Sequence, residues 1–168
     1  MTFISGHDKL PDMKEQLKSA VLPALPIVGT LKLTSHDGKS ISMIDVVDEK
    51  ADRKLDPLFE KCFHEFENYL TGKTKKISIP LDYSNLTPFQ MKVLEVMKEI
   101  PYGRAATYKD LAIKLNSKAY QAIGSACGRN PFLLIYPCHR VLGSKGLGGF
   151  AHGPKMKQEL LELEKGRK

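Results

Sequence analysis

Alternating apolar and polar residues near the start of the chain indicate a β-hairpin. Residues 26–47, PIVGTLKLTSHDGKSISMIDVV, alternate on both sides of SHDGKS, and the Asp-Gly pair at 37–38 is a strong turn signal between two strands. Over residues 53–70 the apolar positions instead recur at helical spacing, and the Thr-Gly pair at 71–72 ends the pattern. These helical positions are Leu55, Leu58, Phe59, Cys62, Phe63, Phe66 and Leu70. The pattern predicts a small antiparallel sheet with one helix packed on it.

A polar, basic segment separates this unit from a second one. Residues 72–85, GKTKKISIPLDYSN, are typical of a linker that ends in a short extended piece, so we expect one domain over 1–85 and another over 86–168. Thr87 and Pro88 then open a helix that ends at IPYGR. Its predicted buried face consists of Phe89, Val93, Leu94, Val96, Met97 and Ile100.

Two short helices follow, in the arrangement of a helix-turn-helix. TYKDLAIKL begins with Thr107 as a predicted N-cap, and Asp110 stands three residues later as in a capping box. KAYQAIGSACG, residues 118–128, again carries small and apolar residues at helical spacing. The predicted helical face consists of Ala119, Ala122, Ile123, Ala126 and Cys127. The fold class is therefore α+β, with a mostly helical second domain.

Composition and charge narrow the function. The chain has 168 residues, 42% of them hydrophobic, which is enough for a sizeable core. Its net charge of +7 is uneven, because residues 1–100 carry −1 and residues 101–168 carry +8. A basic domain attracts polyanions such as nucleic acid, although it can also serve solubility alone. With no signal peptide and no long apolar run, we expect a soluble intracellular protein without membrane partners.

The cysteines point to chemistry at one place only. There are three, Cys62, Cys127 and Cys138, too few and too scattered for a disulfide framework or a metal site. Cys62 lies on the apolar stripe of its helix and is expected in the core, whereas His64 falls off that stripe and is expected to face solvent. In IYPCHRV, Cys138 is followed at once by His139. A buried thiol reacts only with a neighbour that takes its proton, but a Cys-His pair alone is weak evidence of catalysis.

The wider motifs resemble a known family. IPYGRAATYKDLA, GRNPFLLIYPCHRV, GLGGF and LLELE, in this order and spacing, are similar to the O6-alkylguanine-DNA alkyltransferase family, whose signature is Pro-Cys-His-Arg-Val. The resemblance runs from Pro80 to Glu164; over 1–79 only the general layout of sheet and helix matches. It implies a ribonuclease-H-like first domain and a winged-helix-like second one. It also implies repair of double-stranded DNA containing O6-alkylguanine, by irreversible, single-use transfer of the alkyl group to Cys138 without a metal or organic cofactor.

The resemblance also implies the roles of the site residues. Cys138 would be the acceptor, His139 the base that takes the thiol proton through a bound water, and Glu164 the carboxylate that orients the imidazole. Tyr108 would hydrogen-bond or protonate the guanine. Asn130 would tie the recognition helix to the active-site segment. Arg140 would be structural, with its side chain turned away to backbone carbonyls.

Two further sets of residues follow from the same resemblance. The base would be flipped out through the minor groove, against a helix whose small residues allow close approach, although small residues also suit ordinary helix packing. The predicted DNA-binding residues are Tyr108, Ala119, Tyr120, Gln121, Ala122, Gly124, Ser125 and Arg129. The predicted alkylguanine pocket consists of Val141, Phe150, Ala151 and His152.

The chain departs from the family pattern at Gln121, where the family usually has an arginine that fills the gap left by the flipped base. We therefore expect weaker DNA affinity, with Tyr120 as an alternative intercalating residue. Phe150 stands where a tyrosine is common, and the loss of one hydroxyl is expected to matter little. His152 lies at a pocket rim position that influences which alkyl groups enter. Cys127 is expected to pack below the recognition helix rather than to act as a second acceptor.

Three other functions stay open at this point. A lesion sensor would bind alkylated DNA without transfer, but sensors carry another residue in place of the cysteine. A sequence-reading helix-turn-helix regulator would need long polar residues on the recognition helix. A thiol hydrolase or redox enzyme would turn over repeatedly and would not need the basic half. The family reading predicts a monomer in the cytoplasm, associated with the nucleoid, or in the nucleus of a eukaryote.

Overall fold

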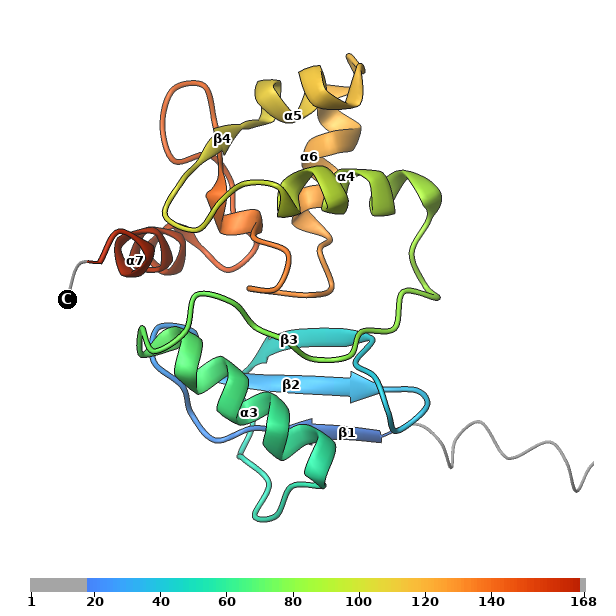
Figure 1. Ribbon diagram of the computed structural model, residues 1–168, viewed down its shortest axis with the longest axis vertical. Helices are drawn as coiled ribbons and strands as arrows, with labels where there is room; N and C mark the ends of the chain where they lie inside the picture. The colour runs from blue at the N-terminus through green and yellow to red at the C-terminus, as the bar shows by residue number, and fades with distance from the viewer. Residues whose placement is uncertain (1–17, 167–168) are drawn as a thin grey trace, which may run out of the picture.

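The computed structural model describes residues 18–166 and shows an α+β fold with a sheet part and a helical part (Figure 1). Strands β1 (Lys18–Val21), β2 (Thr30–Ser35) and β3 (Met43–Val47) form an antiparallel sheet in that order. Helix α3 (Pro57–Leu70) lies across the sheet. Residues 1–17, in which no signal peptide is expected, lie outside the described residues.

The predicted hairpin is confirmed. Leu33 of β2 pairs with Ile44 of β3, so the apolar residues of both strands point to the same face. The turn is held by the carboxylate of Asp37, whose Oδ1 accepts hydrogen bonds from the backbone N–H groups of Lys39 and Ser40, both at 2.8 Å. These bonds lower the pKa of Asp37 to about 2. Gly38 occupies the left-handed region at φ +71°, as a tight turn requires.

Helix α3 begins later than the apolar pattern suggests. Pro57 occupies its first turn, and the residues before it are not helical, so Leu55 packs against the core from a loop. Cys62 is buried on the inner face and His64 is exposed, as the sequence predicts. The short extended segment expected at the end of the linker does not form a named strand. It makes one isolated β-bridge, between Ile41 and Leu81.

The helical part contains the predicted helix-turn-helix. The predicted capping box at Thr107 with Asp110 is confirmed, and the predicted helix start at Thr87 also has a capping box, formed with Gln90. Asn116 adopts the left-handed conformation at φ 51° and ends the first helix of the motif. The elements are α4 (Pro88–Lys98), β4 (Ala106–Thr107), α5 (Tyr108–Leu115), α6 (Tyr120–Gly128), the 3-10 turn η1 (Cys138–Arg140), β5 (Val141–Leu142) and α7 (Pro154–Glu164). Strands β4 and β5 pair in parallel.

Two helical faces are narrower than predicted. Phe89 is 37% exposed, because it lies in the first turn of α4, at the edge of its buried stripe, whereas Val93, Leu94 and Met97 are buried. Ala119 and Ala122 are exposed, and only Ile123, Ala126 and Cys127 of α6 face the core. The exposed alanines lie on the side of α6 for which DNA contact is expected.

The two parts share one hydrophobic core. Buried residues of the sheet and α3, such as Leu33 and Phe66, belong to the same cluster as Leu94 and Phe132 of the helical part. At the sheet edge, the backbone N–H of Ile44 donates to the carbonyl of Pro131 at 2.8 Å. Within residues 18–166, no helix has the length and apolar character that crossing a membrane would require.

Removal of the Thr87 hydroxyl tests how much the capping box of α4 contributes. The Thr87 Oγ1 accepts a hydrogen bond from the Gln90 N–H, and the Gln90 side chain accepts one from the Thr87 N–H. We expect Thr87→Ala to lower the free energy of unfolding by about 1 kcal/mol in urea titrations. Thr74→Ala, at an exposed position without a side-chain hydrogen bond, is the control and should change it little. Equal effects of the two substitutions would contradict a capping role.

Candidate active site

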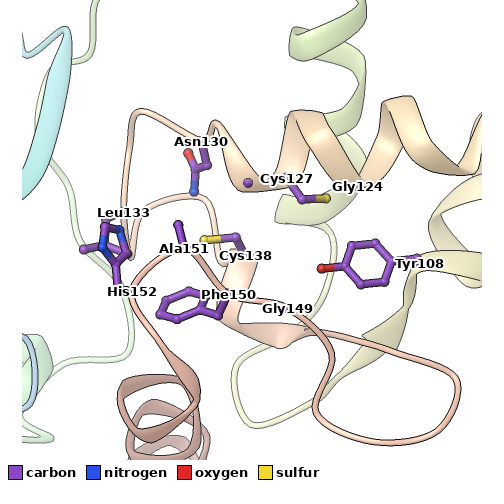
Figure 2. Close-up of a pocket in the computed structure, with 11 residues that line it drawn as sticks. Tyr108, Gly124, Cys127, Asn130, Leu133, Cys138, Gly149, Phe150, Ala151 and His152 are labelled. Atoms are coloured by element: carbon purple, nitrogen blue, oxygen red, sulfur yellow. The ribbon is translucent and has the colours of Figure 1, made fainter.

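Cys138 opens into a cavity of about 160 Å³ between the helix-turn-helix and the loop before α7 (Figure 2). The thiol is partly exposed and points into this space, and the Tyr108 hydroxyl approaches from the start of α5. The lining residues are Tyr108, Gly124, Cys127, Gly128, Asn130, Leu133, Cys138, Gly149, Phe150, Ala151 and His152. The structure thus places the predicted acceptor, Tyr108, Asn130 and three of the four predicted pocket residues around one cavity.

Asn130 fixes the segment that carries the thiol. Its Nδ2 donates to the carbonyl of Tyr136 at 2.7 Å, and its Oδ1 accepts from the N–H of Phe132 at 2.9 Å. These two bonds close the loop between α6 and η1 on itself. Pro137 then precedes the single turn η1, in which Cys138 and His139 are consecutive. Because η1 is a turn and not a strand, the adjacent side chains are not forced to opposite faces.

His139, the residue after Cys138, forms a buried pair with Glu164. The Nε2 of His139 lies 2.7 Å from Oε2 of Glu164, and the side chains are 0% and 1% exposed. Arg140 donates two hydrogen bonds to the same carboxylate, from Nε to Oε1 at 2.7 Å and from Nη2 to Oε2 at 2.9 Å. Its Nη1 also donates to the carbonyl of Ile100, at 2.7 Å. The expected backbone carbonyl contact of Arg140 is therefore present at Ile100, but the expectation lacked its two hydrogen bonds to Glu164.

Two buried polar residues of this site are absent from the residues predicted from the sequence. Tyr69, from α3, donates its hydroxyl hydrogen to Oε2 of Glu164. Lys157, on the inner face of α7, donates its Nζ to the carbonyls of Val141 and Gly149, at 2.5 and 2.8 Å. No local pattern marks Tyr69, which lies 95 residues before its partner. Lys157 could have been found, because it shares a helical face with Leu160 and Glu164.

Burial keeps the resting thiol protonated. Desolvation raises the pKa of Cys138 and outweighs three opposing effects: a hydrogen bond from the Asn130 side chain, the positive charge of Lys157 and the nearby backbone N–H groups. The pKa of Cys127 is raised to about 12 for the same main reason, so this second thiol is a poor nucleophile. A base is needed to make Cys138 reactive.

The buried histidine can supply that base. Desolvation lowers the pKa of His139 below its usual value, and the positive charges of Arg140 and Lys157 lower it further. Glu164 acts in the opposite direction but does not outweigh these effects. Desolvation also works to raise the pKa of Glu164, but hydrogen bonds from His139 and Arg140 prevail and lower it to about 2. A neutral imidazole therefore donates its Nε2 hydrogen to an ionised carboxylate. Among the described residues, Nδ1 of His139 has no hydrogen-bond partner, which leaves its lone pair available.

Lys157 shapes the wall of the cavity. Its two carbonyl partners join β5 to the loop at Gly149, and its ammonium lies 6.0 Å from the centre of the Phe150 ring. The loop is tight, since a Cβ on Gly148 would lie 2.6 Å from the backbone nitrogen of Gly143. Val141 is fully buried and does not line the cavity; it supports the wall through its carbonyl.

The predicted DNA-binding residues lie mainly on the outer side of α6. Tyr120 is 50% exposed, and Gly124 links this side to the cavity. The exposed members are Ala119, Tyr120, Gln121, Ala122, Ser125 and Arg129. Arg129 differs from the rest, since it lines a separate hollow beside β3 and α4. The structure therefore does not bring Arg129 to the cavity of Cys138.

The buried pair makes folding stability acid-sensitive. The pKa values of His139 and Glu164 are lower in the folded protein than in the unfolded chain. As the pH falls, the unfolded chain therefore binds more protons than the folded protein does. The free energy of unfolding should decline below about pH 6.5, where His139 becomes protonated in the unfolded chain. It should decline again between pH 4.5 and pH 2, where Glu164 becomes protonated in the unfolded chain before it does so in the folded protein. The Glu164 step corresponds to about 3 kcal/mol at most. Urea titrations from pH 3 to pH 8 measure this decline.

Glu164→Gln should remove the lower step and reduce stability at pH 7 by about 3 kcal/mol, because Arg140 loses its buried counter-charge. Glu99→Gln is the control, since Glu99 pairs with Lys114 at 58% exposure. An unchanged slope below pH 4.5 in Glu164→Gln would contradict the assignment.

Comparison with known proteins identifies the family of this chain. Residues 24–83 match the family model of the 6-O-methylguanine DNA methyltransferase ribonuclease-like domain, and residues 88–166 match that of the DNA binding domain. A methylated-DNA–protein-cysteine methyltransferase of Saccharolobus solfataricus is 37% identical over 131 residues, 77% of this chain and 85% of the relative. The crystal structure of the Mycobacterium tuberculosis O6-methylguanine methyltransferase has a TM-score of 0.76 at 31% identity, over 90% of this chain and 94% of that one. A structure of Mycobacterium tuberculosis OGT in complex with DNA has a TM-score of 0.75 at 31% identity, over 89% and 93%. The chain belongs to the 6-O-methylguanine DNA methyltransferase family.

Proposed function

We propose that this protein repairs double-stranded DNA by transferring an alkyl group from O6 of guanine directly to Sγ of Cys138. The observation that carries the proposal is the placement of the Cys138 thiol, in a small cavity beside a helix-turn-helix, next to a buried imidazole and carboxylate. The membership of the family and the DNA complex of a relative support the same reaction. The protein acts as a methylated-DNA–protein-cysteine methyltransferase.

Transfer begins with removal of the thiol proton. The proton passes from Cys138 to the free Nδ1 of His139, through a water molecule, and the imidazole becomes positively charged. Glu164 stabilises that charge through Nε2, and its ionised state is held by Arg140. Lys157 and the Asn130 side chain stabilise the thiolate that remains.

The thiolate then attacks the alkyl carbon. The new S–C bond forms as the C–O6 bond breaks, and the electron pair of that bond stays on the guanine oxygen. Tyr108 stabilises the leaving guanine by a hydrogen bond from its hydroxyl, which stays protonated because burial raises its pKa. The thioether has no leaving group that water could release under mild conditions, so each molecule acts once.

The cavity requires the damaged base to leave the duplex. A base stacked inside DNA cannot reach a thiol at the back of a 160 Å³ cavity, so the nucleotide must rotate out. The small, exposed residues of α6 allow close approach to the minor groove. Gln121 then takes the place of the flipped base, and it can hydrogen-bond the orphaned cytosine but lacks a positive charge. Tyr120, half-exposed beside it, offers a stacking surface.

The organisation of the chain is part of the proposal. A division into 1–85 and 86–168 is supported by the two family models, which meet between residues 83 and 88. The protein works as a monomer where DNA is found, in the cytoplasm at the nucleoid or in a nucleus. It holds no cofactor, because the thiol is both catalyst and final acceptor. A sensor, a sequence-reading regulator and a thiol hydrolase each lack this single-use transfer.

Mass spectrometry of the Cys138 peptide tests the reaction. After incubation with a duplex oligonucleotide that carries one O6-methylguanine, this peptide should gain one methyl group, at most one per protein, and the DNA should regain guanine. Cys138→Ser, which keeps the size of the side chain, should bind the duplex and gain none, because a hydroxyl is far less nucleophilic. Binding without methylation of the unsubstituted protein would instead indicate a lesion sensor. A methyl group on the Cys127 peptide would contradict the assignment of the acceptor.

Gln121→Arg tests the part of α6 in DNA binding. We expect tighter binding to an undamaged duplex and a salt dependence steeper by about one counterion, measured by fluorescence anisotropy at several salt concentrations. Thr74→Arg adds the same charge at an exposed position outside α6 and serves as the control. Equal gains in the two variants would show only general attraction, and no gain in Gln121→Arg would contradict a contact at this position.

A further inference from the structure

Tyr69 connects helix α3 of the sheet part to the buried Glu164 of the active site. It is the penultimate residue of α3 and is 1% exposed. Its ring packs edge-on against Tyr102, with ring centroids 5.9 Å apart and an interplanar angle of 88°. Its hydroxyl donates to Oε2 of Glu164. A residue of the N-terminal half thus contacts the carboxylate that holds His139.

Tyr69 and His139 share one carboxylate oxygen. Oε2 of Glu164 accepts from the Tyr69 hydroxyl, from Nε2 of His139 and from Nη2 of Arg140. Oε1 accepts from Nε of Arg140 and, at 3.3 Å, from the backbone N–H of Gly103. Donors on one oxygen compete for the same negative charge, so each weakens the interaction of that oxygen with the others.

We propose that Tyr69 is a positioning residue that limits the basicity of His139 by sharing Oε2 of Glu164 with it. The proposal rests on the proposed function, in which His139 takes the thiol proton. It assigns to the N-terminal part of the chain a role in setting the pH range of alkyl transfer.

The direction of the effect follows from charge. Without the phenol hydrogen, more of the negative charge on Oε2 would face the imidazole, and the protonated form of His139 would be stabilised. The pKa of His139 would then rise. The phenol acts only as a donor, since burial and the charge of Glu164 raise the Tyr69 pKa far above neutral pH.

The other groups that face the pair stay in place when only the hydroxyl is removed. Arg140 of η1 and Lys157 of α7 both oppose protonation of His139. Tyr102, from the loop after α4, faces Arg140 with its ring at 5.6 Å, and Cys138 precedes His139 in η1. Since Tyr69→Phe keeps the ring that packs on Tyr102, a change in pH dependence would come from the lost hydrogen bond.

The test compares the rate of alkyl transfer with pH in single-turnover reactions from pH 5 to 9, with excess O6-methylguanine duplex. In Tyr69→Phe the midpoint of the acid limb should move up by about 0.5 to 1 pH unit, so that the rate well below the midpoint falls about 3- to 10-fold while the rate at pH 9 stays close to that of the unsubstituted protein. Fluorotyrosine at position 69, a stronger donor, should move the midpoint down.

Tyr136→Phe is the matched control. Tyr136 is also 1% exposed, and its hydroxyl bonds Tyr83 and Glu95 rather than Glu164. It should lose stability but keep the midpoint. Uniform slowing of Tyr69→Phe at every pH, or a midpoint that does not move, would show a purely structural role and overturn the proposal.

A second measurement separates this proposal from the proposed function. Titration of the His139 imidazole by NMR in the DNA-free protein should show the same upward pKa shift in Tyr69→Phe and none in Tyr136→Phe. It decides the role of Tyr69 even if the unsubstituted protein leaves Cys138 unmethylated, a result that would refute the proposed function alone. An unshifted His139 pKa in Tyr69→Phe would overturn the inference.

Discussion

The carboxylate of Glu164 accepts five hydrogen bonds in the interior of the protein, and the placement of four parts of the chain depends on it. An ionised carboxylate away from water costs several kcal/mol unless its lone pairs are satisfied. Here the donors come from α3, from the loop at Gly103 and from η1, while the acceptor comes from α7. A shift of any one of these elements would leave part of a buried charge without a partner. The network therefore fixes the geometry of the reactive segment more firmly than apolar packing alone could.

The same environment meets two opposite needs of the thiol. A reactive cysteine must not be consumed by oxidants or stray alkylating agents, and desolvation of its site protects it by keeping the sulfur protonated. It must also ionise when a damaged base arrives. The neutral imidazole of His139 and the ammonium of Lys157 can supply that capacity while the sulfur stays only partly exposed. Protection and reactivity thus come from the balance between desolvation and a few fixed charges.

Features set by local sequence are predictable, and those set by distant contacts are not. The Asp37 turn, the helix start at Thr87 and the capping box at Thr107 depend on neighbouring residues, so sequence patterns predict them. The width of the buried face of a helix cannot be predicted in this way. Residue spacing shows which residues lie on one side of the helix, but not how much of that side a neighbouring element covers, as the partly exposed Phe89 shows. Strand β1 has only four residues, KSAV, too few for a periodic signal.

The site divides in the same way. Motifs within one segment predict Cys138, His139, Asn130 and the loop around Phe150, and the structure brings these residues together. The contact of Tyr69 with Glu164 cannot be predicted from the sequence, because no pattern around a single tyrosine on an amphipathic helix indicates which distant residue it will contact. The contact of Arg140 with Glu164 is not predicted for the same reason, since a guanidinium can donate to carbonyls and to a carboxylate equally well.

The contact of β3 with the helical part has a consequence for the integrity of the chain. The outer edge of this strand is occupied where the Ile44 N–H donates to the carbonyl of Pro131; just before the strand, Ile41 exchanges backbone hydrogen bonds with Pro80 and Asp82. An open strand edge is a template for pairing with another molecule. If the helical part came loose, the backbone groups of β3 that face Pro131 would be exposed and free to pair with another strand. The protein would then tend to self-associate.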